Sequence, residues 1–365
     1  MKKMKHYLFY SALISMSIPL HSMQEDKQLT IQVDKEYITT HCLEWMPKTS
    51  RSTSIEQLKG GCGGARLYTV NFDNADPCVV RLLVGSFARE AAWQDIEISV
   101  MKDADAADIG PKIFDSQSKS DDHIGYIVMK KVGNVLPKEI PWDDAITYTN
   151  LGSFLKKMHE QPSVIPVDEG SLYRRVTNMM GQYTKKWQED GIDGLSDEWV
   201  HTSAMFDNAK QALTPYERTQ LVHGDLLLGN ILHDGTRFWA IDWEQSRLAA
   251  DPLFDVALVQ DTLVPKTYHT HFMQAYCGQD VIPADREKRF NIMRMVTSCF
   301  IGLAYGSCAP TEFTHLFKKY NEEQTDVDLA LHAIARNGFK RETKNDFATF
   351  GALCFSRGYT LSQLK

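Results

Sequence analysis

Short apolar runs separated by turn residues occupy the chain from about residue 30 to residue 130. Runs of this length, bounded by Gly, Asn, Asp or Pro, are typical of β-strands, and the polar stretch 73–77 indicates a hairpin turn. In 87–104 the apolar residues instead recur every three or four positions, which predicts a helix. The predicted strands lie at 29–33, 55–59, 66–72, 78–84 and 126–129.

The pattern changes to helices after Pro141. Apolar residues at 151, 154, 155 and 158 follow the i, i+3, i+4, i+7 spacing of a buried helical stripe. Two short apolar runs, 221–222 and 238–242, read as strands within this helical part. The other predicted helices lie at 171–189, at 196–213 and from about 252 to the end of the chain.

This change of pattern divides the chain. A length of 365 residues is enough for about two domains. We therefore expect an α+β fold, with a β-rich N-terminal lobe at 23–133 and a mainly helical C-terminal lobe at 134–365. A cleft between two lobes is a common place for a ligand.

Composition and charge narrow the function. With 43% hydrophobic and 24% charged residues the chain is neither disordered nor collagen-like. Its net charge of −7 argues against a nucleic-acid-binding protein and suits a small polar or cationic substrate. Seven cysteines without a C-x-x-C spacing indicate neither a zinc site nor a disulfide framework.

Residues 1–22 have the layout of a secretory signal peptide. Lys2, Lys3 and Lys5 precede an apolar run at 7–20, and Ser22 precedes a candidate cleavage point. The alternative is a frayed amphipathic N-terminus. The run is too short for a stable membrane span, and no other run reaches 18 apolar residues.

One group of polar residues has the spacing of a catalytic site. His223, Asp225 and Asn230 follow the spacing H-x-D-x-x-x-x-N of a kinase catalytic loop, and Asp242 lies where kinases carry a metal-binding Asp. Phosphoryl transfer needs a base at the acceptor hydroxyl and Mg²⁺ on the nucleotide phosphates. Asp225 can accept the hydroxyl proton, and Asn230 and Asp242 offer the hard oxygen ligands that Mg²⁺ prefers. His223 would hold the loop through hydrogen bonds.

These residues, followed by Trp243-Glu244-Gln245-Ser246 and then by Asp251-Pro252-Leu253-Phe254-Asp255, resemble the aminoglycoside phosphotransferase/choline kinase superfamily. They are most similar to its bacterial choline/ethanolamine kinase branch, where Glu244 replaces a Gly of typical aminoglycoside kinases. The resemblance implies a protein-kinase-like two-lobe fold, with ATP and Mg²⁺ as cofactors. It implies a catalytic base at Asp225, Mg²⁺ ligands at Asn230 and Asp242, an extra acid and second metal contact at Glu244, and an Asp255 that braces the catalytic loop.

The resemblance also implies a nucleotide site in the N-terminal lobe. Arg81 lies inside an apolar strand, where it would neutralise the nucleotide phosphates. Its expected partner is Glu97 or, alternatively, Glu90. The alternative without a function is an Arg on an edge strand that faces water. Met129 and Lys130 resemble the hinge beside the adenine ring. Gly60, Gly61, Gly63 and Gly64 resemble the turn that covers the phosphates with backbone N–H groups. The alternative is an ordinary tight hairpin turn, which also needs glycine.

The acceptor is expected to be choline, ethanolamine or a related amino alcohol. A quaternary ammonium needs an aromatic cage, yet all seven tryptophans lie at or before 243, which weakens choline specifically. The alternatives are an aminoglycoside or other small alcohol, and a non-catalytic nucleotide-binding protein. The need for ATP favours the cytoplasm, and the signal-like start favours export. The sequence leaves the oligomeric state open.

Overall fold

The computed structural model divides the chain into two compact units, Met1–Val132 and Gly133–Lys365. Several predictions fall outside the described residues: the signal-like segment 1–22, Gly60 to Gly64, Glu90 and almost all of the helix at 171–189. The described residues are 23–46, 50–58, 65–84, 91–120, 123–132, 142–162, 181, 196–213, 215, 220–246, 251–279, 284–306, 309–337 and 343–363.

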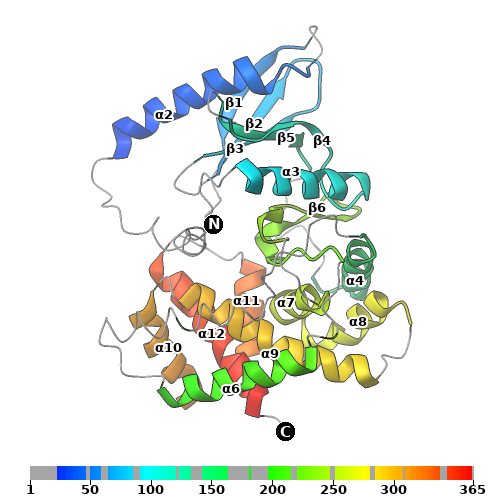
Figure 1. Cartoon of the computed structure of the whole chain (residues 1–365), viewed down its shortest axis with the longest axis vertical. Coiled ribbons are helices and arrows are strands. Elements are labelled where there is room, and N and C mark those ends of the chain that lie inside the picture. The colour runs from blue at the N-terminus through cyan, green and yellow to red at the C-terminus, as the bar shows by residue number, and fades with distance from the viewer. Residues whose placement is uncertain are drawn as a thin grey trace, which may run out of the picture. The chain divides into compact units, whose positions relative to one another are not determined.

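A five-stranded antiparallel sheet with strand order β1-β2-β3-β5-β4 forms the centre of the first unit (Figure 1). β3 pairs with β2 and with β5 without a register shift, with Tyr68 opposite Val80 and Arg81 opposite Ile127, whereas the outer pairs β1–β2 and β4–β5 each contain one irregularity. The strands predicted at 55–59, 66–72, 78–84 and 126–129 are confirmed, whereas β4 was not predicted. The strands are β1 (Ser52–Gln57), β2 (Arg66–Phe72), β3 (Cys78–Leu83), β4 (Ile113–Gln117) and β5 (Gly125–Lys130).

Helices cover both faces of this sheet. On one face, α2 (Met23–Tyr37) and the π-helical turn η1 (Ile38–Cys42) place Ile38 and Cys42 in a buried cluster with Val80 and Leu82 of β3. Successive side chains of a strand point to opposite faces. Arg81 therefore faces the other side, where α3 (Ala91–Ala106) packs.

The prediction of a strand at 29–33 is wrong, because this segment lies inside α2. The alternating Leu29, Ile31 and Val33 suggest a half-buried strand, but Val33 is 54% exposed. The buried positions are instead Asp34 and Ile38, which follow Ile31 at helical spacing. Asp34 is 1% exposed and is paired with Arg66 at 2.5 Å and with the Tyr68 hydroxyl at 2.5 Å, so α2 is bound to β2.

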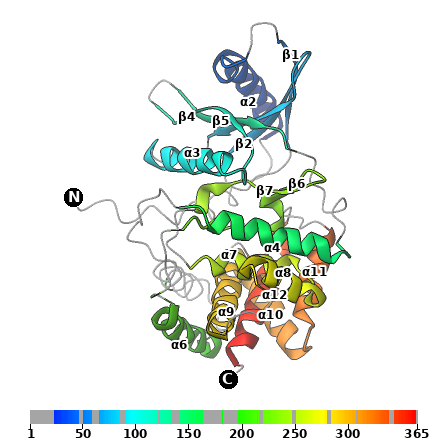
Figure 2. The ribbon, with the colours of Figure 1, turned by 90° about the vertical axis from the view of Figure 1, so that its right-hand side faces the viewer.

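The second unit is mainly helical, as predicted (Figures 1 and 2). The helix predicted at 196–213 is α6. The helices are α4 (Ala145–His159), α6 (Ser196–Leu213), α7 (Leu253–Leu263), α8 (His269–Cys277), α9 (Ala284–Gly306), α10 (Pro310–Glu322), α11 (Val327–Asn337) and α12 (Lys344–Gln363). Short 3-10 turns are η4 (Leu228–Asn230), η5 (Trp243–Gln245) and η6 (Lys266–Tyr268), and a two-stranded sheet pairs β6 (Ile231–His233) with β7 (Phe238–Ala240).

Helices α9 and α12 pack against one another at the centre of this unit. A Cβ atom at Gly302 would lie 2.6 Å from the Phe355 nitrogen, and one at Gly351 would lie 2.6 Å from the Gly306 nitrogen. Such contacts are closer than a real Cβ tolerates, so glycine at these positions lets the two helix backbones approach. Phe355 is fully buried at this contact.

The prediction of a strand at 221–222 is also wrong. Leu221 and Val222 are buried, as an apolar run suggests, but they form no strand in the described structure. The Leu221 N–H donates to the Gln161 carbonyl, 3.2 Å away, beside an isolated bridge between Pro162 and Gln220. The run 238–242 begins with β7 as predicted.

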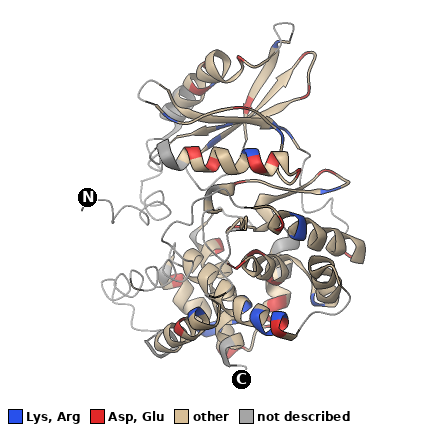
Figure 3. Cartoon of the chain, turned by 45° about the vertical axis from the view of Figure 1, so that its right-hand side comes forward, with Lys and Arg blue, Asp and Glu red and all other residues tan. Residues whose placement is uncertain are grey.

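Acidic residues recur along α3, as Figure 3 shows. Asp95 is exposed, Asp103 and Asp105 are partly exposed, and Glu97 is buried against Arg81. Within the described residues, no helix combines the length and the apolar character that a membrane crossing requires.

Candidate functional site

The predicted catalytic loop runs from His223 to Asn230 and leads directly into β6. At its end, the Asn230 side chain donates from Nδ2 to the Asp225 carbonyl at 2.7 Å and to the Asp225 carboxylate at 3.1 Å. Asn230 is buried, whereas Asp225 is partly exposed. Asn230 therefore holds a carboxylate that solvent can reach.

The β6–β7 hairpin brings Asp242 next to this loop. Ile231 pairs with Ala240, and the Ile241 N–H donates to the Asn230 carbonyl at 3.0 Å. Asn230 and Asp242 therefore flank the same open end of the hairpin, with Asp242 in a left-handed conformation (φ 66°, ψ 57°). Asp is one of the few residues besides glycine that adopt this conformation readily.

His223 links the loop to the second strand of the hairpin. Its Nε2 lies 2.8 Å from the Ile241 carbonyl, and its Nδ1 accepts the Asp225 N–H at 3.3 Å. Because a carbonyl can only accept, Nε2 carries the hydrogen, and the ring is held as one neutral tautomer. The ring also packs against Trp243, with centroids 4.6 Å apart.

Asp255, in the first turn of α7, binds the backbone of the catalytic loop through hydrogen bonds. Its Oδ2 accepts the His223 N–H at 2.7 Å, and its Oδ1 accepts the Gly224 N–H at 2.9 Å. Burial alone would raise the pKa of the Asp255 carboxyl. Donation from the His159 side chain, together with the His223 N–H, instead holds that pKa below its usual value.

Gly224 occupies the position between His223 and Asp225. Its φ of +80° belongs to the region that glycine adopts without strain, and a Cβ there would lie 2.7 Å from the Gln245 carbonyl oxygen. The catalytic loop and η5 therefore approach one another as closely as glycine allows.

Replacing Gly224 by alanine is expected to lower the free energy of unfolding by about 2–4 kcal/mol, through positive-φ strain and the contact with Gln245. Gly235→Ala is the matched control, because Gly235 also has a positive φ (+95°) but its Cβ would meet nothing within 4 Å. Urea unfolding of both variants measures the difference. Equal losses in the two variants would contradict the steric role of Gly224.

Of the residues predicted to bind the nucleotide, Arg81 and Glu97 lie together. Arg81 Nη1 is 2.9 Å from Glu97 Oε1, and the two side chains are 8% and 6% exposed. Because β3 is an inner strand of the sheet, the alternative of an edge-strand Arg that faces water is wrong. A charge inside an apolar strand is tolerated when it is paired in this way.

Met129 and Lys130 lie at the end of β5. Met129 is buried between Val79 and Ile113, whereas the Lys130 side chain is exposed. The Lys130 N–H donates to the Lys112 carbonyl at 2.8 Å, so this N–H is used within the sheet. The Glu244 side chain and the four predicted glycines of the phosphate turn lie outside the described part of the structure.

Comparison with known proteins gives the family. The model of the phosphotransferase enzyme family matches residues 55–289. A comparison with curated protein sequences finds no match.

Several solved kinases share the fold at low sequence identity. A choline/ethanolamine kinase family protein from Mesorhizobium loti is 18% identical, with a TM-score of 0.55 over 92% of this chain and 100% of that one. An ethanolamine kinase from Plasmodium vivax is 13% identical, with a TM-score of 0.56 over 88% and 96%. APH(2")-IIa, solved with streptomycin and ATP, is 12% identical, with a TM-score of 0.54 over 84% and 97%.

The family match covers β1 to β5, the catalytic loop, the β6–β7 hairpin and α7, which are the elements that carry the predicted site. The chain therefore belongs to the phosphotransferase enzyme family, and it shares its fold with solved choline/ethanolamine kinases and aminoglycoside phosphotransferases.

Proposed function

We propose that the protein transfers the γ-phosphoryl group of ATP to the hydroxyl of a small amino alcohol such as choline or ethanolamine. The observation that carries the proposal is the contact between Asn230 and the partly exposed Asp225 carboxylate, at the end of the hairpin that also bears Asp242. Family membership supplies the reaction class. ATP as the donor is supported by the fold shared with an enzyme solved with ATP.

In this proposal Asp225 is the base. Its carboxylate accepts the proton of the acceptor hydroxyl as the oxygen attacks the γ-phosphorus, while the leaving ADP oxygen departs on the opposite side. Asn230 orients the carboxylate through its Nδ2 hydrogen bond. His223 and Asp255 fix the backbone on both sides of Gly224, so that Asp225 keeps its position during transfer.

The donor set at the hairpin end fits Mg²⁺. Asn230 uses Nδ2 toward Asp225, which leaves its Oδ1 as the ligand atom, and Asp242 supplies a carboxylate from the adjacent strand end. Magnesium is commonly held by one or two protein oxygens and by substrate phosphates. When bound, Mg²⁺ would offset charge on the phosphates; Glu244 is proposed as an additional ligand.

In the N-terminal unit, Arg81 is proposed to contact the nucleotide phosphates, with Glu97 fixing its guanidinium. The Gly60 to Gly64 turn is proposed to cover the phosphates with backbone N–H groups. Since the Lys130 N–H is engaged in the sheet, adenine would meet carbonyl groups of Met129 and Lys130 or the residues that follow.

The aromatic residues favour ethanolamine-like acceptors over choline. A cage around a quaternary ammonium would have to draw on the nine Phe and Tyr side chains in 268–320. Five of them, at 272, 290, 300, 313 and 317, are 0–7% exposed and belong to the core. A primary ammonium can be held by hydrogen bonds and does not need such a cage.

A coupled assay of ADP release tests the proposal directly. Ethanolamine, choline, thiamine and an aminoglycoside are each offered with ATP, with and without Mg²⁺. Turnover with an amino alcohol that requires Mg²⁺ is the expected result. Turnover only with the aminoglycoside would support the alternative acceptor, and nucleotide binding without any turnover would support a non-catalytic protein.

We also propose a cytoplasmic location, because the reaction consumes ATP. The exported alternative depends on residues 1–22 alone. Sequencing the N-terminus of the protein from its native cell separates the two, since export predicts cleavage near Ser22.

A further inference from the structure

Tyr276 of α8 contacts a histidine that lies behind the catalytic loop. Its hydroxyl oxygen is 3.1 Å from Nδ1 of His159, the last residue of α4, and the two rings meet edge to face with centroids 5.6 Å apart. The other ring nitrogen, Nε2, lies 3.1 Å from Asp255 Oδ2. The imidazole therefore lies between a phenol and the carboxylate that supports the loop.

The close packing of α4 on α8 fixes this contact. A Cβ at Gly152 of α4 would lie only 2.3 Å from the Phe272 carbonyl oxygen of α8, so the two helices touch at their backbones. Figure 2 shows α4 and α8 next to one another. Tyr276 lies one turn beyond Phe272, so its ring has little freedom to leave His159.

The chemistry of the three groups selects one tautomer of His159. Asp255 is held as a carboxylate and can only accept hydrogen bonds, so Nε2 carries a hydrogen, and the neutral form of the ring that fits this contact is the Nε2–H tautomer. In that form Nδ1 is an acceptor, to which the phenol O–H of Tyr276 can donate. Burial raises the pKa of Tyr276, so the phenol keeps its proton.

The hydrogen bonds continue to the residue next to the proposed base. Asp255 Oδ2 accepts from both His159 and the His223 N–H, and Oδ1 accepts from the Gly224 N–H. Any rotation of the carboxylate therefore moves two peptide groups that precede Asp225. Tyr276, which lies 51 positions after Asp225 in the sequence, is connected to that segment by three successive hydrogen bonds.

We propose that Tyr276 is a positioning residue for phosphoryl transfer: its hydroxyl holds His159 as the Nε2–H tautomer, and His159 in turn fixes the Asp255 carboxylate beneath the catalytic loop. This inference rests on the proposed role of Asp225 as the base. Tyr276 itself touches neither the acceptor nor the nucleotide in this account.

The test compares Tyr276→Phe with Tyr37→Phe. Each variant removes one hydroxyl and keeps the ring. The Tyr37 hydroxyl of α2 donates to the Ile124 carbonyl at 2.7 Å, and Tyr37 belongs to the other unit and to no part of the proposed site, so this variant is the matched control. Turnover and KM for ATP are measured with the best acceptor of the panel, and the His159 ring is observed by NMR in protein labelled with ¹⁵N-histidine.

For Tyr276→Phe we expect kcat to fall about tenfold, as the loss of one hydrogen bond allows, with KM for ATP unchanged within about twofold. The His159 ring nitrogens should lose the pattern of a single Nε2–H tautomer, while Tyr37→Phe keeps both the pattern and kcat. An unchanged kcat, or an unchanged His159 spectrum, in Tyr276→Phe would overturn the proposal.

The NMR measurement needs no substrate. If the wild-type protein turned over no acceptor, the proposed function would fail, while the His159 spectrum would still decide whether Tyr276 sets the tautomer. If turnover were normal and the spectrum of Tyr276→Phe were unchanged, only the role of Tyr276 would be lost.

Discussion

Asp225→Asn is expected to reduce kcat by about 10²- to 10⁴-fold, the usual contribution of a general base. Asparagine has nearly the shape of aspartate but cannot take the proton of the acceptor hydroxyl. Binding of Mg²⁺ and nucleotide should persist, because Asn230, Asp242 and Arg81 are unchanged. Calorimetric titration with a non-hydrolysable ATP analogue, alongside the coupled assay, measures both effects.

Asp207→Asn is the control for this prediction, since Asp207 lies exposed on α6. It makes the same chemical change away from the loop and should keep wild-type turnover. Wild-type turnover in Asp225→Asn would remove the assigned role of Asp225. Loss of nucleotide binding together with turnover would instead indicate that the carboxylate contributes to the metal site.

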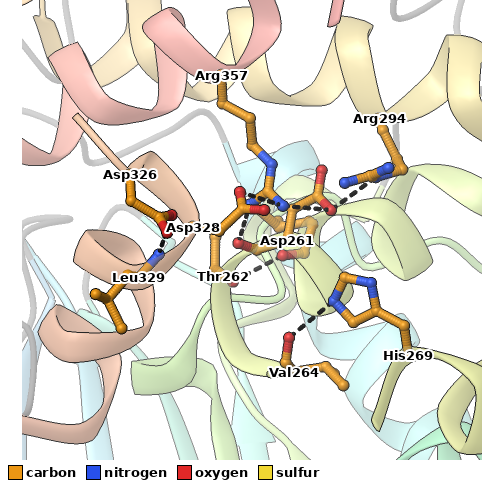
Figure 4. Close-up of polar contacts among 10 residues, drawn as sticks. Asp261, Thr262, Val264, His269, Arg294, Asp326, Asp328, Leu329 and Arg357 are labelled. Atoms are coloured by element: carbon orange, nitrogen blue, oxygen red, sulfur yellow. Dashed lines mark hydrogen bonds and ion pairs between the residues drawn. The ribbon is translucent and has the colours of Figure 1, made fainter. Parts of the chain in front are cut away.

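A second large effect is expected from a buried ion-pair cluster in the helical unit (Figure 4). Arg357 of α12 is 4% exposed, and its Nη2 lies 2.8 Å from Asp328 Oδ1 of α11 and 3.3 Å from Asp261 Oδ1 of α7. Its Nη1 also donates to the Asp261 carbonyl. Arg294 of α9 contacts Asp261 Oδ1 at 2.8 Å.

Four helices therefore meet at one set of charges. Nearby, His269 Nε2 lies 2.9 Å from the Val264 carbonyl, and burial lowers the pKa of His269 to about 4. The ring is neutral at physiological pH and adds no third cation to the two arginines. Opposite charges in the cluster are thus matched, two arginines with two aspartates.

Arg357→Met is expected to lower the free energy of unfolding by about 3–5 kcal/mol, because it leaves Asp261 buried with only one of its two arginine partners. Methionine keeps most of the volume of the arginine stem, so the loss reports the charge and its hydrogen bonds. Urea unfolding of the full chain measures it.

The matched control is Arg237→Met on the β6–β7 hairpin. Arg237 is 47% exposed, lies 3.9 Å from Asp234 and stacks on Trp239. An exposed pair of this kind contributes about 0–1 kcal/mol. Similar losses in both variants would contradict the stabilising role of the buried cluster. Adding Asp261→Asn to Arg357→Met should recover part of the loss, since it removes the charge left without a full set of partners.

Helices and strands were predicted most accurately where the pattern of apolar residues repeats over several periods. The helix at 196–213 and the strand at 66–72 have the predicted bounds, because each is long enough for its period to be read. A run of five residues, 29–33, was too short to separate strand from helix. β4 (Ile113–Gln117) escaped prediction because its sequence, Ile-Phe-Asp-Ser-Gln, has no clear alternation.

Some contacts of the candidate site could likewise be predicted from the sequence, and others could not. The spacing of His223, Asp225 and Asn230 predicted a loop whose members touch, and a charge in an apolar strand predicted that Arg81 is paired. Tyr276 gave no signal, because an aromatic residue on a helix is usually core and its partner His159 is 117 positions away. Contacts between helices distant in the sequence depend on packing, which local pattern does not contain.

The position of α2 has a practical consequence for anyone who dissects this protein. The matched family segment begins at residue 55, so a fragment cut to that segment would lack α2 and η1. The sheet face bearing Val80 and Leu82 would then meet water, and Tyr68 would lose the carboxylate of Asp34. A fragment trimmed by family boundaries would carry an apolar surface prone to self-association, and expression should start early enough to keep the helix that covers it.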